Sequence, residues 1–167
     1  DYTTLEEFYP NGTITSSGMS KWCGAGGWRL GFVHIPEALG EAYFNSVIGI
    51  ASETYSCAAS PIQVAATAAY ELHELADTFL ARQILALSHI SNYCSETLCQ
   101  AGVVVHEAQG GFYLFPDFSP FTEALKKRNI VSSQQLTRSL LTESGVALLP
   151  GKAFRMPDTS LTARLAF

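Results

Sequence analysis

Charge is scarce in this 167-residue sequence, since only 15% of the residues are charged while 47% are hydrophobic. An ordinary soluble domain carries roughly a quarter charged residues. The ten Lys and Arg residues are scattered without forming a basic stripe, and the formal net charge is -5. These features argue against a surface that binds nucleic acid or an anionic membrane. We therefore expect small molecules or other proteins as partners.

The sequence also lacks long apolar runs and paired cysteines. No window reaches the roughly eighteen apolar residues that a membrane-spanning helix needs, and no targeting segment follows Asp1 and Tyr2. The four cysteines form neither a CxxC pair nor the spacing of a secreted disulfide scaffold. The sequence therefore predicts a soluble, cytoplasmic protein with reduced thiols. The shortage of charge indicates that an interface or a domain outside this chain covers part of its surface.

Strand and helix signals alternate along the chain, without repeats or low-complexity tracts. Capping signals mark several helices, such as Ser132 with Gln135 at a beginning and Gly145 at an end. The elements that we expect are strands at residues 13–15 and 30–35, helices at 37–48, 60–75 and 79–102, a hairpin of 103–106 and 112–115, helices beginning near Ser119 and Ser132, and strands at 146–149 and 161–167. This order predicts an α/β or α+β fold.

Lys21 and Arg29 flank a glycine-rich loop, residues 24–27, between the first two expected strands. Eight residues of extended chain would separate them by about 26 Å, so both reach one ligand only if the glycines fold the chain back. Two cations in a partly dry pocket repel each other unless a dianion lies between them or the lysine is neutral or covalently engaged. A phosphate-bearing aldehyde meets both conditions, because its carbonyl condenses with the lysine and its phosphate accepts the arginine's paired donors. Pyridoxal phosphate is such a molecule.

The segment around Lys21 resembles the cofactor-lysine segment of the class I and II aminotransferases, the fold-type I pyridoxal phosphate-dependent enzymes. The family pattern S-x-S-K is present with Gly18 in place of its first serine, and G-W-R-L-G-F follows. Further family segments follow in the family's order: Ser60-Pro61 with Gln63, Gly110 to Leu114, Gly145 to Gly151, Ala153-Phe154 and Ala163 to Phe167. Arg155 departs from the pattern, because a glycine usually follows Ala-Phe.

The resemblance implies a role for three residues. Lys21 would bind the cofactor covalently and act in catalysis, Arg29 would bind the cofactor's phosphate, and Arg164 would bind the α-carboxylate of the substrate. Taken alone, Lys21 and Arg29 also fit a solvated surface lysine and an ion-pair partner at a strand edge, and Arg164 fits a solubilising edge charge. The four histidines lie far apart without partners at ligand spacing, so no metal site is predicted.

The resemblance further implies an α/β fold made of two parts of a fold-type I enzyme. Residues 1–75 would form the end of the large cofactor-binding domain, residues 76–102 an interdomain helix, and residues 103–167 the small domain. Family members carry more than this chain's length again before the lysine, so we expect a C-terminal portion of the enzyme. The full-length enzyme would be a homodimer.

The implied activity is the transfer of an amino group between an amino acid and a 2-oxo acid, in amino acid metabolism. Two alternatives stay open. Related fold-type I enzymes act as C–S lyases or decarboxylases with the same lysine, so the scaffold does not fix the reaction. The isolated chain is also expected to be inactive on its own, because one lysine and one phosphate-binding arginine lack the opposing half of the site.

Overall fold

The computed structural model describes residues 3–71 and 73–167, and Asp1, Tyr2 and Leu72 lie outside the described part. The expectation drawn from the first two residues, that no targeting segment follows them, therefore falls outside the description. Within the described part, no helix combines the length and the apolar character that crossing a membrane requires.

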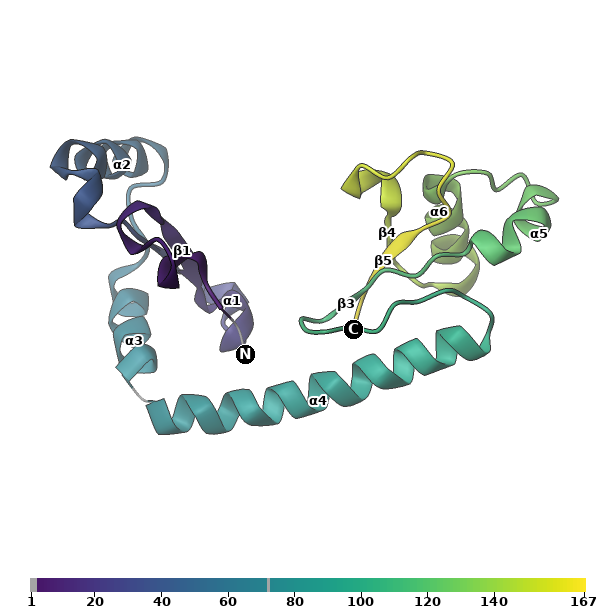
Figure 1. Cartoon of the computed structure of the whole chain (residues 1–167), viewed down its shortest axis with the longest axis horizontal. Coiled ribbons are helices and arrows are strands. Elements are labelled where there is room, and N and C mark those ends of the chain that lie inside the picture. The colour runs from purple at the N-terminus through teal and green to yellow at the C-terminus, as the bar shows by residue number, and fades with distance from the viewer. Residues whose placement is uncertain (1–2, 72) are drawn as a thin grey trace. The chain divides into compact units, whose positions relative to one another are not determined.

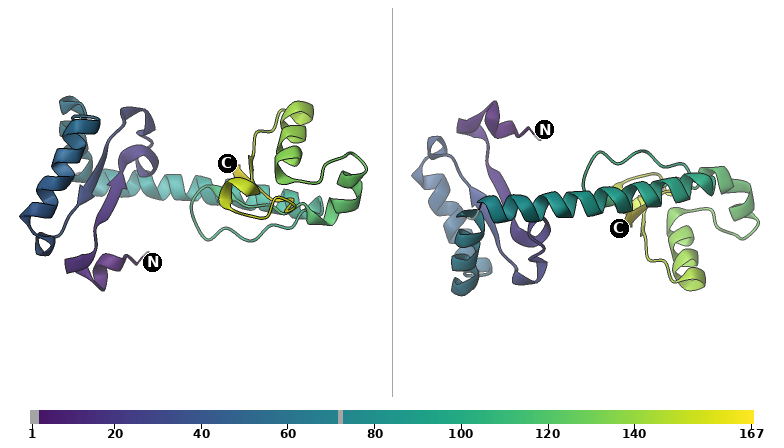
Figure 2. Two further views of the ribbon diagram at one scale, coloured as in Figure 1. Left: turned by 90° about the horizontal axis from the view of Figure 1, so that it is seen from above. Right: turned by 90° about the horizontal axis from the view of Figure 1, so that it is seen from below.

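The chain divides into two units, Asp1–Ala81 and Arg82–Phe167 (Figure 1). The boundary between them falls inside α4 (His73–Gln100), which the views in Figure 2 show as one unbroken helix. A long helix in this region agrees with the sequence pattern. The domain boundaries expected after residues 75 and 102 remain a prediction.

The first unit contains a two-stranded antiparallel sheet and three of the labelled helices. Its elements before α4 include β1 (Thr15–Gly18), α1 (Met19–Trp22), the 3-10 turn η3 (Gly26–Trp28), β2 (Gly31–His34), the 3-10 turn η4 (Glu37–Leu39), α2 (Glu41–Thr54) and α3 (Ser60–Glu71). Gly18 lies opposite Gly31 in the pairing of β1 with β2. A Cβ on Gly31 would lie 3.0 Å from the carbonyl oxygen of Ser17, so a larger residue there would push the two strands apart.

One helix of the first unit begins elsewhere than the sequence predicts. Gly40 has a φ of +85° and a ψ of 155°, which is not helical, so it separates η4 from α2 and interrupts the helix expected at 37–48. The helix expected at 60–75 begins at Ser60 as predicted but ends at Glu71. The carbonyl of Ala59 accepts hydrogen bonds from the amides of Ile62 and Gln63, and the side chain of Gln63 donates to the carbonyl of Ala58 (2.7 Å).

The second unit has a three-stranded antiparallel sheet in the order β3-β5-β4. These strands are β3 (Tyr113–Leu114), β4 (Leu149–Pro150) and β5 (Ala163–Ala166), and two shorter helices, α5 (Thr122–Lys126) and α6 (Ser133–Ser144), lie between β3 and β4 in the chain. The predicted hairpin of 103–106 with 112–115 is wrong, because β3 pairs with β5 and Val104 pairs with Asp117. The residues Leu114 and Ala163 of the observed pairing are buried, so burial in the tertiary structure overrides the local turn signal.

The predicted caps of α6 are confirmed, and a glycine also follows the end of α4. Gly102 follows α4 with a φ of +86°, and the amide of Val103 donates to the carbonyl of Leu98 (3.0 Å). At the start of α6, the hydroxyl of Ser132 accepts from the amide of Gln135 (3.3 Å). Gly145 ends this helix with a φ of +72°, in the left-handed region.

A small hydrophobic core lies beneath α6. Its buried members are Ile130, Leu136 and Leu161, and the partly buried side chains packed against them are Phe118, Leu125 and Leu140. Because these residues come from three separate segments of the chain, burying them joins α5, α6 and the approach to β5.

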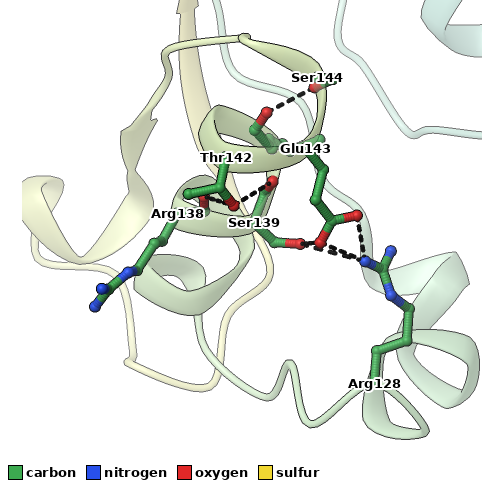
Figure 3. Close-up of polar contacts among 7 residues, drawn as sticks. Arg128, Arg138, Ser139, Thr142, Glu143 and Ser144 are labelled. Atoms are coloured by element: carbon green, nitrogen blue, oxygen red, sulfur yellow. Dashed lines mark hydrogen bonds and ion pairs between the residues drawn. The ribbon is translucent and has the colours of Figure 1, made fainter.

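An exposed ion pair connects α6 with the segment after α5 (Figure 3). Nη2 of Arg128 lies 2.6 Å from Oε1 of Glu143, and the hydroxyl of Ser139 donates to the same carboxylate oxygen. The hydrogen bond from Ser139, followed by that from Arg128, lowers the pKa of Glu143 from its usual range.

Candidate functional site

The glycine-rich loop that carries Lys21 folds back on itself. The amide of Met19 donates to the carbonyl of Leu30 (3.2 Å), and the amide of Ala25 donates to the carbonyl of Met19 (3.2 Å). Gly24 has a φ of +66°, a conformation that glycine adopts without a steric penalty. The chain thus returns beside α1, so the loop is not extended and meets the geometric condition for Lys21 and Arg29 to reach one ligand.

Arg29 ends η3 in an unusual backbone conformation for a residue with a side chain. Its φ of 57° and ψ of 43° lie in the left-handed region. Nη1 of its guanidinium donates to the carbonyl of Gly26 at 2.8 Å, which ties the side chain to its own loop. The remaining N–H groups of this exposed guanidinium form a set of donors suited to an anion.

A large groove lies beside this loop in the first unit. Its volume is about 1420 Å³, and its walls come from β1, β2, α2 and α3. Arg29 and Ser17 supply donors to the wall, while Phe32 and Ile48 supply apolar surface. The groove lining therefore combines hydrogen-bond donors with apolar surface.

Lys21 itself is not among the residues that line the groove. It lies on α1, is exposed, and follows the groove-lining residues Gly18 and Met19. The structure thus brings Arg29 to the groove wall and leaves Lys21 on the helix that extends from that wall. Its role as the cofactor lysine remains a prediction.

An aromatic cluster joins α1 to α3 next to Lys21. The indole Nε1 of Trp22 donates to the hydroxyl of Tyr70 (3.3 Å), and their ring centroids lie 5.1 Å apart. The ring of Phe32 meets Tyr70 edge to face at 5.5 Å. Sequence reasoning missed Tyr70, because the contact joins residues 48 positions apart and no local motif marks it.

Arg164 lies in the second unit, at the central strand β5 opposite Leu149 of β4. Its side-chain Cζ lies 4.3 Å from the centre of the Tyr113 ring and 5.0 Å from the centre of the Phe154 ring. Among residues 3–71 and 73–167, no carboxylate forms an ion pair with Arg164. Sequence reasoning quoted both aromatic residues within family segments but gave them no role.

Arg155 shows why glycine suits its position. It ends the 3-10 turn η6 (Gly151–Phe154) with a φ of 62° and a ψ of 18°, in the left-handed region. Glycine enters this region without a steric penalty, whereas a residue with a Cβ does so at some cost. Arg155 therefore adopts a backbone conformation that favours the glycine of the family pattern.

The chain matches the family model described as aminotransferase class I and II over residues 3–166. It therefore belongs to this family, whose members use pyridoxal phosphate. It is 29% identical over 163 residues to an aspartate aminotransferase of Sulfolobus acidocaldarius, covering 95% of this chain and 37% of that protein. It is 35% identical over 150 residues to an aspartate aminotransferase of Pinus pinaster, covering 87% of this chain and 30% of that protein.

Solved structures agree with this assignment. A mutant of Thermus thermophilus aspartate aminotransferase matches with a TM-score of 0.83 and 22% identity, over all of this chain and 42% of that chain. An aspartate aminotransferase of Thermotoga maritima matches with a TM-score of 0.65 and 30% identity, over 92% of this chain and 35% of that chain. The expected α/β fold of the fold-type I aminotransferases is thus confirmed, and the chain spans well under half the length of these relatives.

The donors of the first unit suit the cofactor of this family. The Arg29 guanidinium and the Ser17 hydroxyl are among the donors on the groove wall, and a phosphate accepts hydrogen bonds from groups of this kind.

Proposed function

We propose that this chain is the C-terminal portion of a pyridoxal phosphate-dependent aminotransferase that moves an amino group between an amino acid and a 2-oxo acid. The observation that carries the proposal is the folded-back loop, which attaches Arg29 to the wall of a groove while Lys21 lies on the adjoining α1. The family match over residues 3–166 supports the same activity.

Lys21 and Arg29 would divide the work on the cofactor. Arg29 would bind the phosphate through the N–H groups that its bond to Gly26 leaves available. Lys21 would hold the cofactor covalently until the amino group of the substrate displaces it, and the freed amine of Lys21 would then move a proton at the α-carbon of the substrate. When bound, pyridoxal phosphate supplies an electron sink for the charge that develops on that carbon.

Arg164 would bind the α-carboxylate of the substrate. A guanidinium presents two parallel N–H donors to a carboxylate, which fixes both the position and the orientation of the bound acid. Its place on β5, the central strand of the three-stranded sheet, gives this group a well-supported backbone. A positioned carboxylate presents its α-carbon consistently to the general base.

The chain on its own would be inactive, and a specific observation favours this. Lys21 is exposed and is not among the residues that line the groove. A catalytic amine needs surroundings that exclude water and hold it in place. We infer that the rest of a full-length, homodimeric enzyme supplies them, and the exposed apolar side chains of the first unit, such as Phe44 and Ile48, suit such a covering.

A reducing, cytoplasmic location belongs to the same proposal. All four cysteines are free, and Cys57 and Cys99 are exposed. Exposed free thiols persist in compartments where glutathione and thioredoxin keep them reduced.

Borohydride reduction of the full-length protein with pyridoxal phosphate tests the proposal. We expect a single stable adduct at Lys21, found by peptide mapping. Lys21→Ala should abolish transamination without changing the circular dichroism spectrum, whereas Lys127→Ala, at an exposed lysine of the second unit, should leave both intact. Turnover retained in Lys21→Ala, or labelling spread evenly over the lysines, would contradict the assignment.

A panel of amino acids and 2-oxo acids tests the reaction type. An aminotransferase converts each amino acid that it accepts into the 2-oxo acid with the same side chain and passes the amino group to a second oxo acid. Release of a thiol or of carbon dioxide would instead identify a C–S lyase or a decarboxylase on the same scaffold.

A further inference from the structure

Two aromatic rings of the second unit contact the Arg164 guanidinium, and each is supported by another ring. Tyr113 lies 4.3 Å from Cζ of Arg164 and packs against Phe112, with ring centroids 4.4 Å apart. Phe154 lies 5.0 Å from the same atom and meets Phe115 edge to face at 5.6 Å. The residues come from β3, its flanking positions, β5 and η6, so the tertiary fold creates this cluster.

Ring contacts restrict the long side chain of Arg164 without using its hydrogen-bond donors. The ring faces carry partial negative charge and attract the guanidinium above them. Cζ of Arg164 lies over both rings, and neither ring supplies a carboxylate for its N–H groups. A carboxylate is planar and accepts two N–H groups along one edge. The contacts therefore hold the cation in place without providing it with an anionic partner.

Four acidic residues of the second unit are engaged elsewhere. Asp117 accepts from the amide and hydroxyl of Ser119, and the other engaged acids are Glu123 with Lys126, Glu143 with Arg128 and Asp158 with Lys152. Within the described chain, Arg164 has no carboxylate partner of its own. A half-buried arginine in this condition favours an anion from outside the chain.

We propose that Tyr113 and Phe154 are positioning residues, which hold the guanidinium of Arg164 so that its N–H edge receives the substrate's α-carboxylate. This inference rests on the proposed function, since that function supplies the carboxylate. The rings act through Arg164 and touch no reacting atom. Their removal therefore weakens recognition of the carboxylate and leaves the rest of the substrate unaffected.

Kinetics of the full-length enzyme, reconstituted with pyridoxal phosphate, test this inference. Each amino acid of a panel is paired with the amine that lacks its α-carboxylate, and kcat/KM is measured for both. Tyr113→Leu and Phe154→Leu should each lower kcat/KM for the amino acids about three-fold, the factor that one cation–π contact at an exposed site gives. The values for the amines should not change. Tyr113→Phe, which keeps the ring, should behave like the unsubstituted enzyme.

Tyr93→Leu is the matched control, because Tyr93 is an exposed aromatic residue of α4. It should leave both classes of substrate unaffected. A double-mutant cycle adds a second check: with Arg164→Gln already present, removing either ring should cause no further loss. Equal losses for amino acids and amines, or a full three-fold loss in the Arg164→Gln background, would overturn the positioning role.

Calorimetric titration with the 2-oxo acids separates this inference from the proposed function. If the protein binds the 2-oxo acids, each ring variant lowers this affinity about three-fold, and no transamination is seen, the positioning role stands and the proposed activity is refuted. Transamination with unchanged 2-oxo acid affinity in both ring variants would retain the activity and refute the positioning role. A protein that binds no carboxylate refutes both.

Discussion

The two units of this chain support their candidate residues in different ways. In the second unit, Arg164 sits on the central strand of a three-stranded sheet and contacts two supported rings. In the first unit, Arg29 is tied only to its own loop through the carbonyl of Gly26, and Lys21 is exposed on a helix of four residues. The guanidinium of Arg164 is therefore held by contacts between distant segments of its unit, whereas that of Arg29 is held by a contact within its own loop.

The distribution of buried residues shows the same contrast. The second unit buries a cluster that includes Ile130, Leu136 and Leu161, whereas Met19 and Ala66 are the buried hydrophobic residues of the described first unit. Apolar area removed from water is the main source of stability in a domain. We infer that the second unit keeps its structure through its own packing and that the first unit relies on surfaces outside the chain.

Cutting into the core of the second unit should give the largest effect. Leu136→Ala removes a side chain that is 3% exposed, and we expect a loss of about 2–5 kcal/mol in the stability of this unit. Val64→Ala, at a site on α3 that is 72% exposed, should change stability by less than about 0.5 kcal/mol.

Hydrogen exchange resolved by peptide measures this contrast in the 167-residue chain. Leu136→Ala should reduce the protection of α6, while the fluorescence of the two tryptophans, Trp22 and Trp28, should not change because both lie in the first unit. If both units lose protection together, they unfold as one body and the contrast drawn here is wrong.

Replacing Arg29 and Arg164 one at a time tests whether the two units have different functions. In the full-length enzyme, Arg29→Gln should weaken the binding of pyridoxal phosphate roughly 10- to 100-fold. Arg164→Gln should raise KM for amino acids by a similar factor. Both changes are expected when a hydrogen bond to a charged group is lost. Cofactor titration and steady-state kinetics measure the two effects. Each variant serves as the control for the other, so a loss of both properties in either variant contradicts the division of roles.

The sequence was most informative where the structural signal is local. The cap at Ser132 with Gln135 and the left-handed Gly145 were predictable, because each depends on residues within one helical turn. The glycines at 24–27 allow the chain to fold back, and Gly24 has a φ of +66° there. The roles of Lys21, Arg29 and Arg164 came from resemblance to a family and remain to be tested by experiment.

Contacts between distant segments could not be predicted in this way. The pairing of β3 with β5 joins residues about fifty positions apart, and the rings near Arg164 come from segments on both sides of it in space. Tyr70 meets Trp22 across a comparable separation. Local sequence patterns do not predict which distant strand or ring will lie next to a residue. The contacts of Arg164 with Tyr113 and Phe154 could therefore be found only in the structure.

A smaller effect is expected from the helix cap of the second unit. Ser132→Ala removes the hydroxyl that accepts from the amide of Gln135, and this should cost about 1 kcal/mol of stability. Ser144→Ala is the matched control, because its hydroxyl donates to the carbonyl of Leu140 within the same helix and caps no N–H group (Figure 3). The free energy of unfolding in urea, measured from the helical signal, should be lower for Ser132→Ala than for Ser144→Ala. Equal values for the two variants would show that the cap does not contribute to stability.

The smallest expected effect is on the pH dependence of stability through the exposed Glu143, which pairs α6 with Arg128. Hydrogen bonds from Ser139 and then Arg128 lower the pKa of Glu143 in the folded state. A group with a lowered folded pKa contributes stability above its unfolded pKa and loses that contribution as the pH falls through the folded value. Glu143→Gln should therefore lower the melting temperature slightly at pH 7, and the difference from the unsubstituted chain should vanish at a pH below that folded value.

Glu123→Gln provides the matched control for this acid effect, because Glu123 pairs with Lys126 only within a single turn of α5 and has a highly exposed side chain. Breaking a pair within one short helix leaves the connection between α5 and α6 intact, whereas breaking the pair of Glu143 with Arg128 loosens it. Melting curves of both variants across the acid range test this. A difference between Glu143→Gln and the unsubstituted chain that persists at low pH would assign the effect to packing of the side chain, because the charge is then absent from both proteins.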